Sequence, residues 1–322
     1  MTDFEGQAPL RVLVSCVQMQ NELDTYRADL ESRGIELVVP EITHQQLNED
    51  ELLDIMPEID GVIAGDDQFT GAVLQASKRL RILSKWGVGT DAIDKEAAAR
   101  EGIPVTNTPG MFGADVAEVA LSYMLMLARG MHVVDRAVRD GHWLKLEGET
   151  LAGKTAGVVG LGSIGLGVCQ RAKAFDMTVI GSDPWPESQE RARAMAVEVV
   201  ELDDLFARSD YVSLNAPLTP ESRHMVNERT LGIMKRGAKV INTGRGPLID
   251  EDALIEALRS GHLSAAALDV FEVEPLPMDS PLRTMDNVIL GAHNGSNTRE
   301  AVQRTSARAV ENLLAHLFTE PR

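Results

Sequence analysis

Short apolar runs rich in β-branched residues alternate with amphipathic or alanine-rich stretches along almost the whole chain. This alternation predicts an α/β fold in which parallel sheets are covered by helices on both faces. In the first third of the chain we expect strands at residues 11–17, 37–39, 61–64, 81–84 and 103–106. In the second half we expect strands at residues 155–159, 178–181, 197–200, 211–214, 239–242, 265–270 and 288–290. Two doubly wound sheets follow from this pattern.

The alternation is interrupted by one long, largely apolar stretch at residues 115–140. Pro109, Gly110 and Gly113 precede it and supply a turn and a helix start, so a long buried helix joining two halves is expected. The pattern at residues 298–318 is again helical. This last helix either covers its own domain or crosses back onto the first one, and the pattern does not decide between the two.

The composition is that of an ordinary globular protein, with 44% hydrophobic and 25% charged residues in a chain of 322. This length predicts two domains. The formal net charge of -18 argues against nucleic acid and anionic membrane surfaces as partners, because both are bound mainly through Lys and Arg. A small anionic ligand is still compatible with this charge, since a single arginine can bind it locally.

The two cysteines, Cys16 and Cys169, lie inside apolar runs and have no companion at metal-ligand spacing. They therefore predict small core residues in a reducing compartment, with no disulfide and no metal site. The first ten residues are acidic and lack the basic and apolar regions of a targeting segment, and no window has the length of a membrane span. A cytoplasmic location is expected.

A glycine-rich turn follows the expected strand at residues 155–159 and leads into a helical stretch. Its sequence is Gly160-Leu161-Gly162-Ser163-Ile164-Gly165. In this context the first glycine permits a tight turn, the second lets a pyrophosphate approach the backbone, and the third lets the helix pack on the strand. The helix N-terminus then faces the phosphates, which predicts a dinucleotide site.

An acidic residue stands where a dinucleotide site of this kind needs one. Asp183 ends the next expected strand, eighteen positions after Gly165, where its carboxylate can accept both ribose hydroxyls. An acid there favours NAD over NADP, because a 2′-phosphate would meet a like charge. The ordinary alternative is a glycine-rich turn followed by a surface Asp. That alternative does not require the strand, the glycines, the helix and the acid to occur together.

Three polar side chains follow expected strands in the second half, namely Arg245, Glu274 and His293. Open α/β sheets bind ligands at the carboxyl ends of their strands. The planar fork of Arg245 suits a carboxylate, and the imidazole of His293 can exchange a proton near neutral pH. Glu274 can accept a hydrogen bond from the other ring nitrogen and fix the tautomer. Each residue alone also fits a surface salt bridge, a structural histidine or a solvated acid.

Four segments together resemble the D-isomer-specific 2-hydroxyacid dehydrogenase family, especially its phosphoglycerate dehydrogenase branch. The resemblance runs in register from about residue 80 to residue 301. The segments are VTNTPG at 105–110, the glycine turn at 160–165, INTGRG at 241–246 and ALDVFEVEP at 267–275. The resemblance implies an NAD-dependent oxidoreductase that transfers a hydride between NAD(H) and a small 2-hydroxy or 2-keto acid.

The resemblance also implies the domain organisation. Residues 1–107 plus 296–322 would form the substrate-binding domain, and residues 108–295 the NAD-binding domain, with the active site in the cleft between them. A homodimer is implied, formed through the NAD-binding domain with the long helix and the segment around Trp143.

Family roles map onto matching positions of this chain. His293 is implied as the acid/base, Glu274 as its partner, and Arg245 as the group that orients the substrate carboxylate and carbonyl. The implied substrate-binding residues are Lys85, Trp86, Gly87, Val88, Gly89 and Arg245. The implied cofactor-binding residues are Gly160, Gly162, Ser163, Ile164, Gly165, Asp183, Ala216, Thr243, Gly244, Asp269, His293 and Gly295.

The chain departs from the family pattern at several places. Phosphoglycerate dehydrogenases usually carry an Arg-containing segment after the strand at 61–64, and this chain has Asp66 and Asp67 there. Two acids at that place argue against a phosphorylated substrate. Asn294 replaces a more usual apolar residue, and Asn215 stands where many relatives have His. The chain ends at residue 322, so no regulatory C-terminal domain is expected.

Two other functions stay open on this fold. One is a dehydrogenase of the same family with a different hydride donor, such as phosphite, which would need the same His and Arg. The other is an NAD(H)-sensing binding protein, against which the intact set of Arg245, Glu274 and His293 argues.

Overall fold

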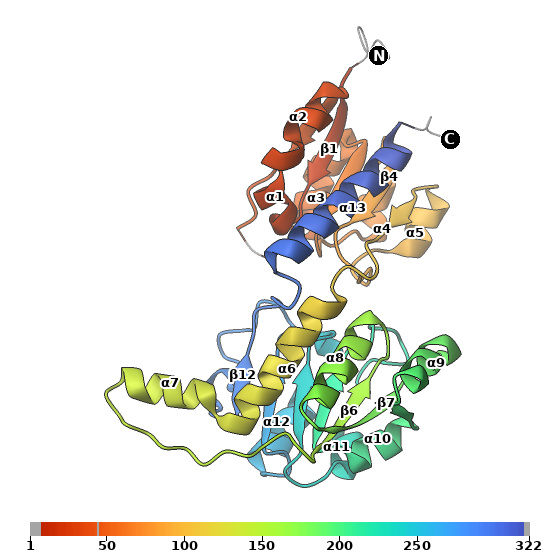
Figure 1. Ribbon diagram of the computed structural model, residues 1–322. Coiled ribbons are helices and arrows are strands. Elements are labelled where there is room, and N and C mark those ends of the chain that lie inside the picture. The colour runs from red at the N-terminus through yellow and green to blue at the C-terminus, as the bar shows by residue number, and fades with distance from the viewer. Residues whose placement is uncertain (1–7, 44, 319–322) are drawn as a thin grey trace. The chain divides into compact units, whose positions relative to one another are not determined.

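The computed structural model describes residues 8–43 and 45–318, and their contacts divide into two compact units (Figure 1). Unit 1 comprises Met1–Met111 and Asn297–Arg322, and unit 2 comprises Phe112–Ser296. The expectations about a targeting segment and about the end of the chain involve residues 1–7 and 319–322, which lie outside the described residues.

Unit 1 is built on a five-stranded parallel sheet in the order β2-β1-β3-β4-β5. The central strands β3 and β4 are buried along their whole length. β3 is accordingly apolar throughout, whereas β4 ends in the buried polar residues Ser84 and Lys85. The strands are β1 (Leu10–Val14), β2 (Ile35–Val38), β3 (Gly61–Ala64), β4 (Ile82–Lys85) and β5 (Val105–Thr106). The helices are α1 (Val17–Glu22), α2 (Asp24–Ser32), α3 (Glu49–Ile55), η1 (Met56–Glu58), α4 (Gly71–Ala76), α5 (Lys95–Arg100) and α13 (Arg299–Leu317).

The last helix, α13, packs on the sheet of unit 1 (Figure 1), which decides the question that the sequence left open. Ser84 on β4 donates a hydrogen bond to the carbonyl of Ala309 at 2.8 Å. A Cβ atom at Gly61 would lie 2.9 Å from Leu313 and 2.8 Å from Leu317, so the absence of a side chain on β3 lets the helix approach closely. The first and last parts of the chain therefore share one core.

Unit 2 is built on a seven-stranded parallel sheet in the order β12-β11-β10-β9-β6-β7-β8. Its strands are β6 (Thr155–Val159), β7 (Thr178–Ser182), β8 (Glu198–Val199), β9 (Tyr211–Leu214), β10 (Lys239–Asn242), β11 (Ala265–Leu268) and β12 (Val288–Leu290). Its helices are α6 (Gly113–Arg129), α7 (Met131–Arg139), α8 (Ser163–Ala174), α9 (Pro186–Ala194), α10 (Leu202–Arg208), α11 (Glu228–Ile233), η2 (Gly246–Leu248), α12 (Glu251–Arg259) and η3 (Pro281–Thr284).

All twelve expected strands are present, in two parallel sheets as predicted. The first expected strand, residues 11–17, is longer than the strand in the structure. β1 ends at Val14, and Val17 already begins α1. Periodicity alone does not separate the end of a buried strand from the start of a buried helix, because both are apolar.

The single long helix expected at residues 115–140 is wrong, because the structure has two helices there. α6 ends at Gly130, which adopts a left-handed conformation with φ 58°, and α7 begins directly after it. Glycine takes this conformation without steric cost. α6 is buried along one face as expected, but α7 has no buried residue and lies beside the edge strand β12 (Figure 1).

Both cysteines are buried and unpaired, as the sequence predicts. Among the described residues, no helix has both the length and the apolar content that crossing a membrane requires.

Candidate active site

A histidine and a glutamate lie side by side at the carboxyl end of the sheet in unit 2. His293 follows β12 and Glu274 follows β11, and the two strands are neighbours. His293 Nδ1 lies 2.8 Å from Glu274 Oε2, and both side chains are three-quarters buried or more. Because Nδ1 is engaged, proton exchange with a ligand would go through Nε2. The sequence predicted this pair, and the structure brings its two members together.

The backbone holds His293 in an uncommon conformation. Its φ is 52°, in the left-handed region that residues other than glycine rarely adopt. Its N–H donates to the carbonyl of Asp269 at 2.7 Å, so the turn is tied to the end of β11. Strained residues of this kind concentrate at functional sites, where the surrounding structure holds them.

Asp269 secures the same turn through its side chain. Its carboxylate accepts hydrogen bonds from the backbone N–H of Gly295 at 2.9 Å and from the Tyr123 hydroxyl at 3.1 Å. Burial and the Asp269 charge raise the pKa of Tyr123, so its hydroxyl stays a donor. A Cβ atom at Gly291 would lie 2.2 Å from the Asp269 carboxylate. Tyr123 is a supporting residue that sequence patterns miss, because it comes from the distant helix α6.

Arg245 lies after β10 in a turn that packs against the loop of Glu274. Asn242 holds the turn, since its side chain donates to the carbonyl of Arg245 at 2.9 Å and accepts from the N–H of Gly244 at 3.1 Å. A Cβ atom at Gly246 would lie 1.9 Å from the backbone of Phe271, and Phe271 donates its N–H to Glu274 at 3.0 Å. The glycine thus lets the two loops touch.

The glycine turn between β6 and α8 has the geometry that a bound pyrophosphate needs. Gly160 has φ 85°, and a Cβ atom at Gly165 would lie 1.8 Å from the carbonyl oxygen of Gly160. At Gly162, in contrast, a Cβ atom would meet no atom within 4 Å. The space beside this backbone is open at the N-terminus of α8, which begins with Ser163 and Ile164. The residues present therefore fit a dinucleotide.

The other predicted cofactor residues surround the same edge of the sheet. Asp183 follows β7 and accepts the N–H of Leu161 in the glycine turn at 2.7 Å. A Cβ atom at Gly244 would lie 3.0 Å from the carbonyl oxygen of Ala216, so the loops after β9 and β10 are in close contact. Thr243 donates to Asn215 at 3.2 Å.

The predicted substrate loop belongs to unit 1. Lys85 ends β4, and Trp86 is buried with its indole N–H donating to Ser306 on α13 at 3.0 Å. Gly87 has φ 131°, and its N–H donates to Thr108 at 3.0 Å. Val88 is 44% exposed, and Gly89 follows it. The predicted site residues are thus divided, with Lys85 to Gly89 in one unit and the remainder in the other.

Comparison with known proteins decides the family. Residues 121–295 match the family model described as D-isomer specific 2-hydroxyacid dehydrogenase, NAD binding domain. A hydroxypyruvate reductase from Thermotoga maritima is 42% identical over 284 residues, covering 86% of this chain and 91% of that protein. The chain belongs to the D-isomer specific 2-hydroxyacid dehydrogenases.

Two further relatives show the range of the family. A D-3-phosphoglycerate dehydrogenase from Methanocaldococcus jannaschii is 41% identical over 271 residues, covering 83% of this chain and 51% of that longer protein. A D-lactate dehydrogenase from Aquifex aeolicus, solved with NAD and lactic acid, is 25% identical with a TM-score of 0.81, covering 97% of this chain and 100% of that chain. This dehydrogenase is thus an NAD-dependent oxidoreductase that acts on the CH–OH group of 2-hydroxy acids.

The two acids after β3 play different parts in this dehydrogenase. Asp67 is wholly buried, and its carboxylate accepts hydrogen bonds from the Ser15 hydroxyl at 2.5 Å and the N–H groups of Leu47 and Gly65 at 2.9 Å. Burial raises its pKa despite these bonds. The expectation that two acids after this strand oppose a phosphate therefore does not hold for Asp67, whose buried carboxylate holds loops together. Only Asp66, 40% exposed, faces outward.

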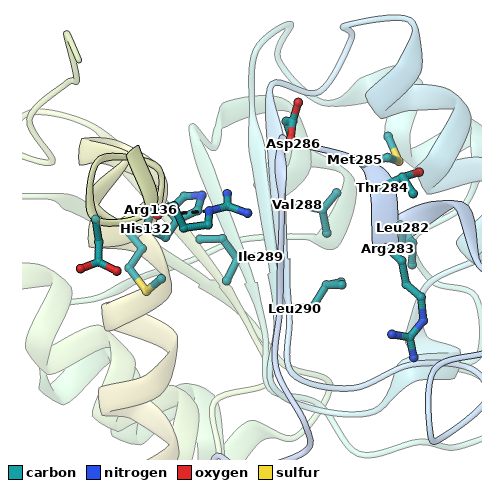
Figure 2. A pocket seen from close by; sticks show the side chains of 12 residues that line it. His132, Arg136, Leu282, Arg283, Thr284, Met285, Asp286, Val288, Ile289 and Leu290 are labelled. Atoms are coloured by element: carbon teal, nitrogen blue, oxygen red, sulfur yellow. Dashed lines mark hydrogen bonds between the residues drawn. The ribbon is translucent and has the colours of Figure 1, made fainter. Parts of the chain in front are cut away.

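The dehydrogenase has a concavity in unit 2, between α7 and the η3–β12 segment (Figure 2). His132 and Arg136 line it from α7, opposite Val288 and Ile289. Burial and the neighbouring Arg136 lower the pKa of His132. The lining contains none of the predicted site residues, so this concavity is separate from the His293 and Glu274 pair.

Proposed function

We propose that this dehydrogenase reduces a small, unphosphorylated 2-keto acid with NADH, using His293 as the proton donor. The observation that carries the proposal is the 2.8 Å contact between His293 and Glu274, in the unit that also holds the glycine turn. A ketone that accepts a hydride needs a proton on its oxygen, and a histidine held by a carboxylate can donate it.

The nicotinamide of NADH supplies the hydride. His293 Nε2 donates the proton to the carbonyl oxygen, while Glu274 fixes the ring tautomer through Nδ1 and stabilises the charged ring. The guanidinium of Arg245 receives the carboxylate and polarises the carbonyl. The backbone N–H groups of Val88 and Gly89 are further donors to the carboxylate, and Gly87, whose own N–H donates to Thr108, shapes the loop. Oxidation of the hydroxy acid uses the same groups in reverse.

The remaining predicted residues bind NAD in this proposal. Gly160, Gly162, Ser163, Ile164 and Gly165 surround the pyrophosphate, and Asp183 accepts the ribose hydroxyls. The residues assigned to the rest of the cofactor are Ala216, Thr243, Gly244, Asp269 and Gly295. The open space at Gly162 and the close packing at Gly165 support this assignment.

A carboxylate in unit 1 opposes a phosphate on the substrate. The relatives include both a hydroxypyruvate reductase and a phosphoglycerate dehydrogenase at nearly equal identity, so identity does not separate the two substrates. Asp66 presents a carboxylate after β3, and a phosphate beside it would meet a like charge.

The test is NADH oxidation measured with pyruvate, glyoxylate, hydroxypyruvate, phosphohydroxypyruvate and oxaloacetate. We expect turnover of at least one unphosphorylated acid, and a loss of about 10²–10⁴ in kcat for His293→Ala, the usual worth of a general acid. Glu274→Gln keeps the shape of the loop and serves as the matched variant, with a smaller loss. Reduction of NAD⁺ by phosphite with no reduction of any 2-keto acid, or NADH binding with no turnover, would overturn the proposal in favour of the two alternatives.

We also propose that the enzyme is a homodimer formed through α7 and the segment after it. α7 has no buried residue in the single chain. Met131, Val138 and Trp143 are 58%, 45% and 83% exposed, respectively. Large exposed apolar side chains on α7 and on the segment after it mark an interaction surface, and a second copy is the commonest partner.

A further inference from the structure

Lys85 is a buried cation in unit 1. Its side chain is 4% exposed, and its Nζ lies 3.1 Å from Asp66 Oδ1 and donates to the carbonyl of Trp86 at 2.8 Å. A buried ammonium is costly unless it is paired, and a hydrophobic residue of similar size is often at least as stabilising as a buried ion pair. Fold stability alone therefore does not account for a lysine at this position.

The ammonium lies against the loop that is proposed to receive the substrate carboxylate. A Cβ atom at Gly87 would lie 2.9 Å from Lys85 Nζ, so the ammonium occupies the side on which that residue would carry a side chain. Gly87 is the first residue of the proposed loop, and its φ of 131° turns the backbone directly after Trp86. The charge is thus adjacent to the backbone donors of the loop.

The ion pair also lies near the point where a sheet of this order binds ligands. β1 and β3 are neighbours, and connections leave them toward opposite sides of the sheet in an order of 2-1-3-4-5. Asp66 follows β3, and Cys16 follows β1. Burial raises the pKa of the Cys16 thiol to about 12, and the charges of Lys85 and Asp66 act on it in opposite directions. Both charges are therefore close to the end of β1.

Of the two charges, only the carboxylate reaches solvent, since Asp66 is 40% exposed and Lys85 4%. A ligand at this edge meets the carboxylate first, and the ammonium behind it is already neutralised. An ammonium carries three N–H donors. Two of them are directed at the Asp66 carboxylate and the Trp86 carbonyl.

We propose that the Asp66 and Lys85 pair sets the charge of the substrate side chain. Asp66 occupies the place that a second anionic group of the substrate would take on Lys85, so the enzyme accepts 2-keto acids whose substituent is uncharged and discriminates against those with a second carboxylate or a phosphate. This inference rests on the proposed function and narrows its substrate class.

Asp66→Asn tests the pair directly, because it removes the carboxylate and leaves Lys85 to bind an anion. The measurement is kcat/KM for oxaloacetate divided by kcat/KM for pyruvate. We expect this ratio to rise about ten- to hundredfold, the worth of one hydrogen bond to a charged group. Asp29→Asn is the matched control, since it makes the same charge change in an exposed pair with Arg33 on unit 1 and should leave the ratio unchanged.

Lys85→Met is the second variant, because it leaves the exposed carboxylate of Asp66 and removes the ammonium beneath it. The ratio should then fall about tenfold below that of the wild type. An unchanged ratio in both variants overturns the inference, and the proposed function stands if pyruvate is still reduced.

A binding measurement separates the inference from the proposed function. Malonate should raise the melting temperature of Asp66→Asn but not that of the wild type or of Lys85→Met/Asp66→Asn. If no 2-keto acid is reduced but this pattern holds, the proposed function fails and the anion site stands. If malonate stabilises all three proteins equally, the anion site is not at Lys85.

Discussion

At the scale of single residues, the glycines of the turn between β6 and α8 are there for two different reasons. Gly165 is required by the protein itself, because any Cβ atom would meet the carbonyl of Gly160. Gly162 has φ -71°, which suits any residue, and open space beside it. The fold itself does not require a glycine at this position, and the proposed function does, because a pyrophosphate would approach the backbone there.

This difference gives a paired prediction. Gly162→Ala should melt at the wild-type temperature and bind NADH at least tenfold more weakly, because the methyl group stands where the pyrophosphate approaches. Gly165→Ala should lose about 2 kcal/mol or more of unfolding free energy. Calorimetry and NADH fluorescence titration measure the two effects, and unchanged NADH affinity in Gly162→Ala would contradict the assignment.

Glu149 shows a different kind of residue effect. It accepts hydrogen bonds from the Tyr211 hydroxyl and from Lys239, both at 2.6 Å, and pairs with Lys154 at 3.0 Å. Burial alone would raise its pKa, but the bonds from Lys239, Tyr211 and Lys154 outweigh burial and lower the pKa to about 2. The segment that follows α7 is thereby fastened to the strands β9 and β10.

The sign of the pH effect follows from this lowered pKa. Because the folded enzyme holds Glu149 ionised, its contribution to stability is complete above its ordinary pKa of 4.5 and is lost as the pH falls toward 2. We expect Glu149→Gln to be less stable than the wild type at pH 7, with the difference narrowing steadily below pH 4.5. Urea unfolding at several pH values measures it, and a difference that is constant with pH would be the contrary result.

Sequence reasoning at this scale found the groups that chemistry requires and missed those that only geometry joins. His293, Glu274 and Asp183 follow strand ends that are visible in the apolar pattern, so their placement was predictable. The contact of Tyr123 with Asp269 joins residues 146 positions apart, and no local pattern signals it. Asp66 and Asp67 are adjacent and identical in sequence, so the sequence could not tell which of the two side chains is buried.

At the scale of elements, the break between α6 and α7 determines which part of the chain is core and which is surface. Both helices are apolar enough to be taken as one, and Gly130 alone marks the boundary. A glycine inside a helical pattern can either be tolerated or end the helix, so the sequence did not decide between one helix and two. The strands were easier to predict, because continuous burial in a parallel sheet leaves a run of β-branched residues.

The break itself can be tested by substitution. Gly130→Ala should destabilise the enzyme by about 1–2 kcal/mol, because φ is 58° there and a Cβ atom would meet the side chain of Leu146. Gly232→Ala is the matched control on α11, where a Cβ atom would meet nothing within 4 Å, and it should be neutral or stabilising. Thermal unfolding compares the two, and equal effects would count against the role of Gly130.

At the scale of the whole molecule, the exposed apolar residues of α7 and of the segment after it predict association of two copies. Sedimentation equilibrium should give twice the mass of the 35.0 kDa chain. Trp143→Glu, which places a charge on a side chain that is 83% exposed, should shift the enzyme toward monomer without unfolding either unit. Trp185 is 69% exposed and lies outside α7 and the segment after it. Trp185→Glu is therefore the matched control and should leave the mass unchanged. A wild-type monomer at micromolar concentration would refute the proposal.

The position of α13 has a consequence for how the protein is made. Unit 2 is one continuous stretch, so it can fold as soon as the ribosome releases it. Unit 1 begins first, but Ser84 and Trp86 bond to a helix that emerges more than 200 residues later. The unit that is synthesised first is therefore completed last. Until then, the face of β3 that packs against α13 at Gly61 stays uncovered.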